Sequence, residues 1–265
     1  QSKFSDKTEI LNAIKKKNKI LSKSIKTNIL NEIFGYKIIN KKKTLSSASI
    51  NSKSINKNSI FFGIKGKKFD GNKFAIEAIK NGAILAISNF RIKNSKVKFI
   101  RNPLNLLNTA SSILRKSLNI NTITITGSAG KTSVKELTGF CLNKLEKTYS
   151  SKRSFNNKFG VPLSIFNMPE TAKFSVLEAG MDKKGEIDYL TKLIKPNLGL
   201  ITNISYAHIK NFRNLDHIAK AKSEIIDNIV SDGTMVINMD DQYYKYFSKK
   251  SKNRNLKIIK YSKSN

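Results

Sequence analysis

The chain contains the stretch Thr122-Ile-Thr-Ile-Thr-Gly-Ser-Ala-Gly-Lys-Thr-Ser-Val-Lys-Glu-Leu137. Its β-branched residues over 122–126 predict a buried strand, because branched side chains fit a pleated sheet. A short loop with Gly127 and Gly130 follows, and then a helical pattern over 132–144. A strand that turns through glycines into a helix is the local plan of a nucleotide-phosphate site, since the N–H groups of the loop and the helix N-terminus point at phosphate oxygens.

The spacing of this loop differs from the strict Walker A pattern, Gly-x4-Gly-Lys-Ser/Thr. Ile125 stands where that pattern needs its first glycine, so the shorter form Gly-x-x-Gly-Lys-Thr is present instead. We expect Lys131 to reach the β- and γ-phosphates of ATP and the Thr132 hydroxyl to bind Mg²⁺. The alternative is an ordinary strand-to-helix turn that carries a surface lysine. The predicted ATP-binding residues are Gly127, Ser128, Ala129, Gly130, Lys131, Thr132 and Ser133.

The composition is strongly basic, with 50 Lys and Arg against 18 Asp and Glu in 265 residues and a formal net charge of +32. Such a charge is typical of nucleic-acid-binding proteins. Lysine, however, far exceeds arginine, is accompanied by many asparagines and isoleucines as in AT-rich genomes, and is spread along the whole chain. Basic and aromatic residues do not alternate as they do on a base-stacking surface. We therefore expect no specific nucleic-acid partner, only salt-sensitive adhesion to polyanions.

The length allows two domains, and no apolar run approaches the ~20 residues of a membrane span. The single cysteine, Cys141, excludes a disulfide framework, and no signal peptide is visible, so we expect a cytoplasmic protein and a monomer. We expect Cys141 to be buried as a small hydrophobe on the inward face of the helix over 132–144, together with Val134 and Leu137. The chain starts with Gln1 rather than Met, as fragments and processed products do.

Strands and helices alternate along the chain, which predicts an α/β fold with a mostly parallel sheet and helices on both faces. We expect a basic N-terminal extension over 1–25, a smaller α/β domain over 26–103 and a P-loop-type central domain over 104–265. The boundary lies near Pro103. In the central domain we expect strands at 122–126, 174–178, within 196–203 and at 234–238, with helices over 132–144, 187–194 and 215–230.

Polar residues stand where these strands end. Glu178 closes an apolar strand, Asn203 closes the next, and His208 follows shortly after. Because ligands bind at the carboxyl ends of parallel strands, these side chains are candidates for one site. Glu178 is interpreted as an Mg²⁺ ligand opposite the phosphates, or alternatively as a strand-end acid facing solvent. His208 is either part of the site or a surface residue.

Two more segments carry candidate residues. Asn156 and Asn157 lie in a polar loop before Pro162, where they either donate hydrogen bonds to an anionic substrate or build the turn. Lys222 lies in Ile218-Ala-Lys-Ala-Lys-Ser-Glu224, which by itself is only the basic face of a helix.

Five segments of the chain occur in the order found in Mur ligases, and the chain resembles that family. An ordered set of this kind is far more specific than any one segment. The stretch 51–74 also resembles the family's N-terminal UDP-binding domain, and the matches together cover about residues 45–245. The five segments are 125–133, 154–163, 176–181 with 185–187, 202–208 and 218–224.

The resemblance implies an ATP-dependent amide ligase of peptidoglycan precursor synthesis, a cell-wall activity. Within the family the segments look most like the ligase that joins D-alanyl-D-alanine to UDP-N-acetylmuramoyl-tripeptide through an acyl phosphate. The resemblance places the UDP substrate on the domain over 26–103 and ATP on the domain over 104–265. The implied substrate-binding residues are Asn51, Ser52, Asn156 and Asn157.

The resemblance also implies catalytic roles for Lys131, Glu178, His208 and Lys222. Lys131 would hold the ATP phosphates, Thr132 and Glu178 would bind one Mg²⁺, and His208 would contribute to metal binding. Lys222 matches a lysine that the family carries in carbamylated form. Carbamylation turns an ammonium into an anion, so Lys222 could then ligate a second Mg²⁺.

The chain departs from the family pattern at several points. Asn51-Ser52-Lys53 stands where Asp-Ser-Arg is usual near the uridine, and Ala129 stands where Asn is commoner. The family's third domain, which receives the amine substrate, has no counterpart before Asn265. We therefore expect the central domain to be incomplete and the chain alone not to complete ligation. The alternatives are a MurE-like ligase that accepts meso-diaminopimelate or lysine, a folylpolyglutamate-type ligase, and a non-catalytic nucleotide- or polyanion-binding protein.

Overall fold

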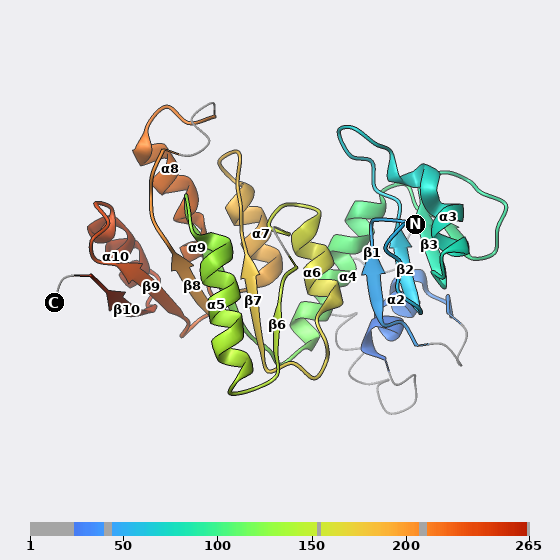
Figure 1. The fold of residues 1–265 in the computed structure, drawn as a ribbon, viewed down its shortest axis with the longest axis horizontal. Helices are drawn as coiled ribbons and strands as arrows, with labels where there is room; N and C mark the ends of the chain where they lie inside the picture. The colour runs from blue at the N-terminus through green and yellow to red at the C-terminus, as the bar shows by residue number, and fades with distance from the viewer. Residues whose placement is uncertain (1–23, 40–43, 153–154, 207–210, 264–265) are drawn as a thin grey trace. The chain divides into compact units, whose positions relative to one another are not determined.

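The computed structural model describes residues 24–39, 44–152, 155–206 and 211–263. These residues form two compact units, each with its own sheet (Figure 1). All the paired strands in both sheets are parallel, so the predicted α/β fold is confirmed. Unit 1 extends to Leu118 and includes residues 165–167, whereas the sequence analysis placed the boundary near Pro103. Most of the basic extension expected over 1–25 lies outside the described residues.

Unit 1 has a four-stranded sheet in the order β1-β2-β3-β4. Strand β2 is buried at every position because its residues, Ser-Ile-Phe-Phe, form a short apolar run in the middle of the sheet. Helix α3 packs Ala75 and Ala78 against Phe61 of this strand. The elements are α2 (Ile25–Phe34), β1 (Ser47–Ser49), β2 (Ser59–Phe62), η1 (Gly71–Phe74), α3 (Ala75–Lys80), β3 (Leu85–Ser88), β4 (Val97–Phe99) and α4 (Pro103–Ser117).

Unit 2 has a six-stranded sheet in the order β10-β9-β8-β5-β7-β6. From the central strand β5 the chain goes to the edge strand β6 and comes back to β7. It then crosses to the other side of β5 and adds β8, β9 and β10, so the strand order reverses at β5. Ligands of open α/β sheets bind at such a reversal, beyond the carboxyl ends of the strands. The strands are β5 (Asn121–Thr126), β6 (Thr148–Ser150), β7 (Phe174–Glu178), β8 (Leu198–Ile201), β9 (Thr234–Asn238) and β10 (Lys257–Tyr261).

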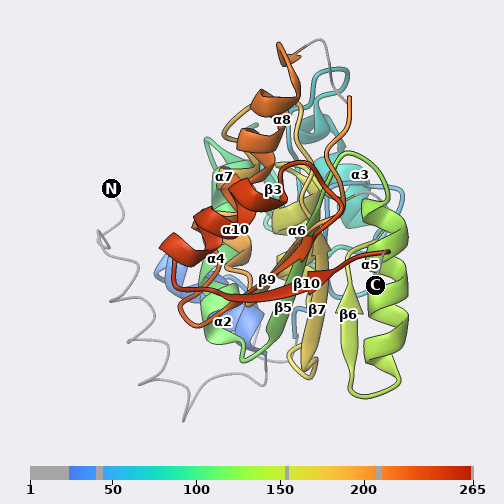
Figure 2. The same cartoon turned by 90° about the vertical axis from the view of Figure 1, so that its left-hand side faces the viewer.

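The helices of unit 2 lie on both faces of its sheet, as Figures 1 and 2 show from two sides. Helix α5 lies on one face and helices α7 to α10 on the other. Connections between parallel strands are right-handed, so the direction in which the chain crosses the sheet decides which face its helix covers. The β5-to-β6 connection crosses in the opposite direction from the later ones, and α5 therefore lies on the opposite face. The helices are α5 (Lys131–Asn143), α6 (Gly160–Asn167, whose last three residues belong to unit 1), α7 (Glu186–Ile194), α8 (Leu215–Lys222), α9 (Glu224–Asp227) and α10 (Tyr244–Asn253).

The inward face of α5 differs from the predicted one. Leu137 is 65% exposed and Cys141 is exposed, so the expectation that they are buried was wrong. Lys135 and Gly139 point inward instead. A Cβ at Gly139 would collide with the Ser150 hydroxyl, so the helix lies closer to β6 than a larger side chain would allow.

The helix expected over 215–230 is broken at Ser223 into α8 and α9. The Ser223 hydroxyl donates to the Lys220 carbonyl at 2.7 Å, a local bond that competes with regular helix geometry. Asn238, at the end of β9, accepts from the backbone N–H of Asp240 and so stabilises its own turn.

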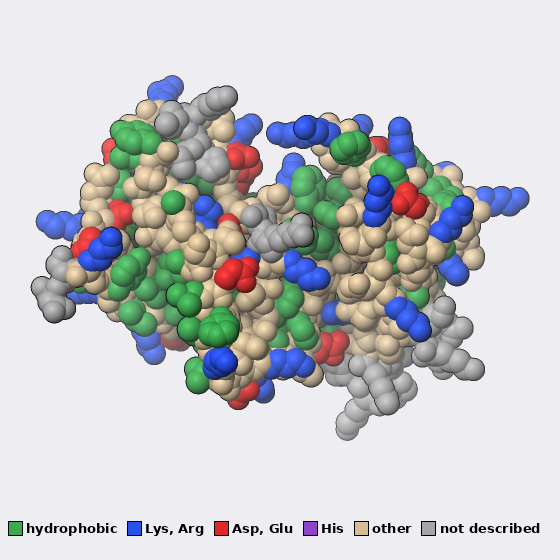
Figure 3. Space-filling view, in the orientation of Figure 1, with side chains coloured by type: hydrophobic (Ala, Val, Ile, Leu, Met, Phe, Trp, Pro, Cys, Tyr) green, Lys and Arg blue, Asp and Glu red, His purple; other side chains and the backbone are tan. Residues whose placement is uncertain are grey.

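The basic side chains are distributed over the surface. On the face shown in Figure 3, Lys and Arg side chains are scattered rather than gathered into one patch, and hydrophobic side chains also reach the surface. Phe140 and Leu145 join Leu137 among the exposed large hydrophobic residues of α5 and the turn after it. Of the helices in the described part of the chain, none is long and apolar enough to span a membrane.

Candidate active site

The loop between β5 and α5 requires glycine at two positions. Gly127 has a φ of 150°, and a Cβ there would overlap the hydroxyl of Thr202, which donates to the Ala129 carbonyl at 2.6 Å. Gly130 has a φ of 77° and is the N-cap residue of α5, and as a glycine it offers no side-chain oxygen to the first turn. The first N–H groups of a helix have no partner within it, so this N-terminus can receive an anion.

Asn203 holds the loop from the end of β8. Its carbonyl accepts from the Ser128 N–H at 3.0 Å, and its side-chain oxygen accepts from the Ala129 N–H at 3.1 Å. The Ser128 hydroxyl donates to the Ser205 carbonyl at 2.9 Å. Because these loop N–H groups are occupied, the N–H groups offered to a phosphate are those at the start of α5.

Lys131 folds back over the loop. Its ammonium donates to the carbonyls of Gly127 at 2.8 Å and Ser128 at 3.2 Å. Burial lowers the pKa of Lys131, and the nearby Glu178 carboxylate opposes that shift. A phosphate bound at the helix N-terminus would lie within reach of this cation, and Ser133 stays exposed in the same first turn.

Glu178 lies at the centre of the site, although it is only 1% exposed. Its Oε2 accepts from the Thr132 hydroxyl at 2.9 Å, and its Oε1 accepts from the Asn156 amide at 2.7 Å. The sheet register brings this about, since Glu178 pairs with Ile125 just before the loop. A buried carboxylate beside a hydroxyl is a donor set that suits Mg²⁺, with phosphate and water oxygens as the other ligands.

Lys222 reaches the loop from the end of α8. Its ammonium donates to the Gly127 carbonyl at 2.9 Å, and the side chain is 1% exposed. Burial lowers the pKa of Lys222 to about 7, and the positive charge of Lys131 acts in the same direction. Neither the ammonium nor the neutral amine of Lys222 is an anionic ligand. Lys222 therefore suits a metal only if its nitrogen is modified to carry a negative charge.

The remaining predicted site residues are placed as follows. The side-chain oxygen of Asn157 accepts from the N–H groups of Phe159 and Gly160, both at 3.0 Å, so it builds the turn into α6. In unit 1, Asn51 is exposed, and the Ser52 hydroxyl donates to Glu77 at 3.0 Å. His208 lies outside the described residues. Within those residues, no three His, Cys, Asp or Glu side chains form a metal-binding group.

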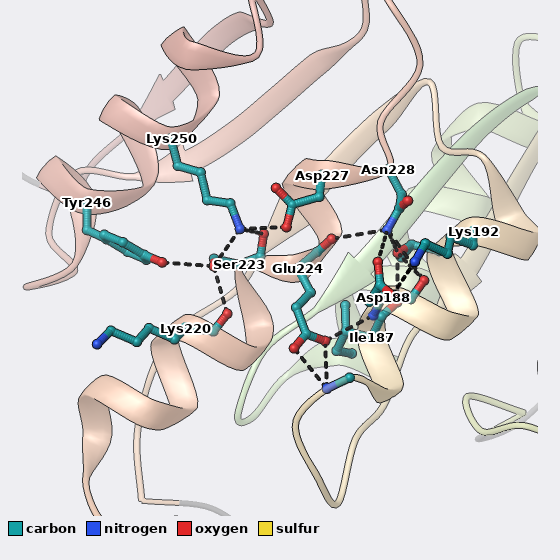
Figure 4. Close-up of polar contacts among 12 residues, drawn as sticks. Ile187, Asp188, Lys192, Lys220, Ser223, Glu224, Asp227, Asn228, Tyr246 and Lys250 are labelled. Carbon is teal, nitrogen blue, oxygen red and sulfur yellow. Dashed lines mark hydrogen bonds and ion pairs between the residues drawn. The ribbon is translucent and has the colours of Figure 1, made fainter.

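Glu224 is a buried acid that the sequence analysis did not single out. Its carboxylate accepts from the Gly185 N–H at 2.8 Å and from the Asp188 N–H at 3.0 Å, at the start of α7. Figure 4 shows Glu224 directed toward Asp188. A carboxylate at a helix N-terminus satisfies N–H groups that the helix leaves open. Glu224, at the start of α9, thus connects the end of α8, which carries Lys222, to the start of α7, which follows Glu178 and β7. The signal in the sequence was an acid two positions after Lys222.

Helix α10 supports the break at Ser223 (Figure 4). The Lys250 ammonium donates to the Ser223 carbonyl at 3.0 Å and pairs with Asp227 at 2.7 Å. The Tyr246 hydroxyl lies 3.1 Å from the Ser223 hydroxyl. These contacts hold α8 and α9 in the orientation that directs Lys222 to the loop.

Comparison with known proteins agrees with this geometry. The profile of the Mur ligase middle domain matches residues 125–265. The UDP-N-acetylmuramoyl-tripeptide–D-alanyl-D-alanine ligases of Buchnera aphidicola subsp. Baizongia pistaciae and Haemophilus influenzae are each 35% identical to the chain. The matches cover 78% and 74% of this chain, but 46% and 44% of those proteins. The chain therefore spans about half the length of these curated relatives.

Solved structures give the same relationship. A MurF structure from Acinetobacter baumannii is similar with a TM-score of 0.73 at 28% identity, over 81% of this chain and 47% of that one. MurF from Thermotoga maritima, solved with ADP, is similar with a TM-score of 0.70 at 25% identity, over 83% of this chain and 51% of that one. The two-sheet fold, the loop geometry and the match over 125–265 lead to one conclusion: the chain belongs to the Mur ligase family.

Proposed function

We propose that the chain provides the ATP-binding and UDP-substrate-binding parts of a MurF-like ligase, which joins D-alanyl-D-alanine to UDP-N-acetylmuramoyl-tripeptide. The observation that carries the proposal is the 2.9 Å contact between the Thr132 hydroxyl and Glu178, beside a helix N-terminus whose cap residue, Gly130, has no side chain. Similarity to MurF proteins supports the choice of substrates. Asn51 and Ser52 of unit 1 are proposed to contact the UDP substrate.

In this proposal the first turn of α5 and Lys131 bind the β- and γ-phosphates, and Thr132 and Glu178 hold Mg²⁺. The metal would neutralise negative charge on the transferring phosphoryl group. Lys131 exchanges its bonds to the loop carbonyls for bonds to phosphate oxygens. Asn156 keeps one oxygen of Glu178 in place, so that the other is directed at the metal.

The reaction would have two steps. The peptide carboxylate attacks the γ-phosphorus of ATP, ADP leaves, and an acyl phosphate forms. The amine of D-alanyl-D-alanine then attacks the acyl carbon, inorganic phosphate leaves, and the amine nitrogen loses a proton as the amide forms. The positive charge of Lys131 stabilises the charge that develops on the phosphoryl oxygens.

We also propose that Lys222 is carbamylated. Its pKa of about 7 leaves much of the amine neutral near pH 7, which is the form that attacks CO2. The amine nitrogen bonds to the carbon of CO2 and loses one proton, which gives a carbamate anion. That anion could ligate a second Mg²⁺ close to Gly127, and His208 is proposed to assist it.

Calorimetry with Mg-ATP on the wild type and Lys131→Ala tests the phosphate site. The wild type is expected to bind, and Lys131→Ala to bind at least tenfold more weakly, because a charge-assisted bond is lost. Equal affinities would refute the site. A panel of UDP-linked peptides and amines then tests the substrate class, since acceptance of meso-diaminopimelate or lysine would indicate a MurE-like ligase.

A further inference from the structure

Lys135 is a charged residue at a position where a helix usually places an apolar one. It lies one turn after Thr132 on α5, points toward the sheet, and is fully buried. Burying an ammonium is costly unless it is paired or hydrogen-bonded, so a methionine or leucine would be the less costly residue for packing alone. The roles assigned above to Lys131, Thr132 and Glu178 do not use it.

The contacts of Lys135 are specific. Its Nζ donates to the Ser151 carbonyl at 2.7 Å and pairs with Glu136 Oε1 at 3.0 Å. Glu136 is exposed, whereas the bond to Ser151 is buried. One turn further along α5, Gly139 lies against Ser150. Helix α5 is therefore joined to the end of β6 by a close contact and a charged hydrogen bond.

The end of β6 and Asn156 belong to the same connection, of which the structure describes residues 151–152 and 155–159. The Phe155 N–H donates to the Lys152 carbonyl at 3.2 Å, which joins the two described pieces. Ser151 is the first residue after the strand, and Asn156 follows in the same connection to α6. Asn156 donates to Glu178, and Glu178 accepts from Thr132 of α5. The contacts thus form a closed ring: α5 holds Ser151 through Lys135, the β6-to-α6 connection carries Asn156, and Asn156 and Thr132 meet at one carboxylate.

We propose that Lys135 is a positioning residue, which fixes the β6-to-α6 connection against α5 so that Asn156 orients Glu178 for the metal. The inference rests on the proposed function. Lys135 is given no contact with nucleotide or metal in the proposed function; it acts through Ser151 and Asn156. Lys135 and Thr132 both lie on α5. If the β6-to-α6 connection moves relative to this helix, the direction from which Asn156 donates to Glu178 changes as well.

A double-mutant cycle on the whole chain tests this inference. Lys135→Met keeps most of the side-chain volume but removes the donor, and Asn156→Ala removes the group that Lys135 is proposed to position. The readout is the dissociation constant of Mg-ATP, measured at several Mg²⁺ concentrations. We expect Lys135→Met to raise it roughly tenfold alone, and less than about twofold in the Asn156→Ala background. Glu136→Gln, which leaves the Ser151 bond intact, is the matched control and should bind as the wild type does.

Other outcomes decide against the inference. If Lys135→Met binds Mg-ATP as the wild type does, or if its effect is the same with and without Asn156, Lys135 does not act by positioning Asn156. A wild type that binds no Mg-ATP would overturn the proposed function and this inference together. If Lys135→Met does not fold, Lys135→Arg takes its place in the cycle. Its larger planar head displaces the Ser151 carbonyl, and the same coupling to Asn156 is expected.

Discussion

The side chain of Lys222 donates a hydrogen bond to the Gly127 carbonyl at 2.9 Å, so the end of α8 is fastened to the phosphate loop. The two residues are far apart in the sequence: Gly127 follows β5, whereas Lys222 lies in the connection from β8 to β9. Their contact places a buried amine beside Lys131, and this environment lowers the pKa of Lys222 to about 7.

The lowered pKa predicts a pH-dependent stability. The folded state loses the Lys222 proton near pH 7, whereas the unfolded chain keeps it to about pH 10.5. Between these values the unfolded state binds more protons, so the free energy of unfolding rises with pH, by up to about 1.4 kcal/mol per pH unit. Urea unfolding at pH 7 to 9 should show this rise in the wild type and not in Lys222→Met. The exposed Lys220→Met is the control and should keep it.

A neutral Lys222 predicts a carbamate. With ¹³C-bicarbonate at pH 8, the wild type and Lys220→Met should show one protein-bound carbamate resonance, and Lys222→Met should show none. A spectrum without this resonance in the wild type would remove Lys222 from the proposed metal ligands.

The two neighbouring asparagines should differ in function. Asn156→Ala frees one oxygen of Glu178, so the affinity for Mg²⁺ in the presence of ATP should fall about 10- to 100-fold. Asn157→Ala removes the acceptor for two N–H groups at α6, which should lower stability by about 1 kcal/mol and leave Mg²⁺ affinity unchanged. Calorimetry and thermal unfolding distinguish the two, and equal Mg²⁺ affinities would refute the role of Asn156.

The two loop glycines should respond differently to alanine. Gly127→Ala places a methyl group onto Thr202, so the loop must move and Mg-ATP binding should fall at least tenfold. Gly130→Ala meets no atom within 4 Å and should cost only the backbone strain of a left-handed residue, about 1 kcal/mol. Measurements of Mg-ATP binding and of unfolding on both variants check this prediction. A larger loss of binding in Gly130→Ala than in Gly127→Ala would contradict it.

Glu224→Gln should loosen the segment after Glu178. The amide turns a donor toward the N–H groups of Gly185 and Asp188, so stability should fall by about 1–3 kcal/mol. Asp227→Asn alters an acid in α9 that pairs with Lys250 near the surface, and it should have little effect. Hydrogen exchange of the Gly185 and Asp188 amides is the direct measurement. Unchanged protection in Glu224→Gln would show that the carboxylate does not hold them.

Much of unit 2 was predictable because its signals are local. The strand, glycines and helix over 122–144 each follow from backbone preferences of adjacent residues. Glu178 was found as a candidate because it closes an apolar strand. Short strands such as β6 were missed, since three residues of half-buried character carry little periodicity.

The orientation of α5 shows where the sequence pattern failed. Its apolar residues suggested an inward face with Leu137 and Cys141, yet Lys135 and Gly139 lie inward. Helical spacing identifies the apolar and polar faces of a helix. It does not say which face packs on the sheet when a glycine such as Gly139 lets the helix lie closer to a strand. Helical spacing therefore does not indicate that Lys135 is buried.

Residue order alone established the α/β alternation, the glycine-dependent turn at Gly127 and Gly130, and the chemical types available to bind phosphate and metal. Folding in three dimensions selected the partners: Thr132 and Asn156 for Glu178, Gly127 for Lys222, and Ser151 for Lys135. The physical reason is the sequence separation of the residues that interact. Backbone conformation depends on neighbouring residues, whereas the burial that lowers the pKa of Lys222 and the register that brings Glu178 to the loop arise only when distant strands pair.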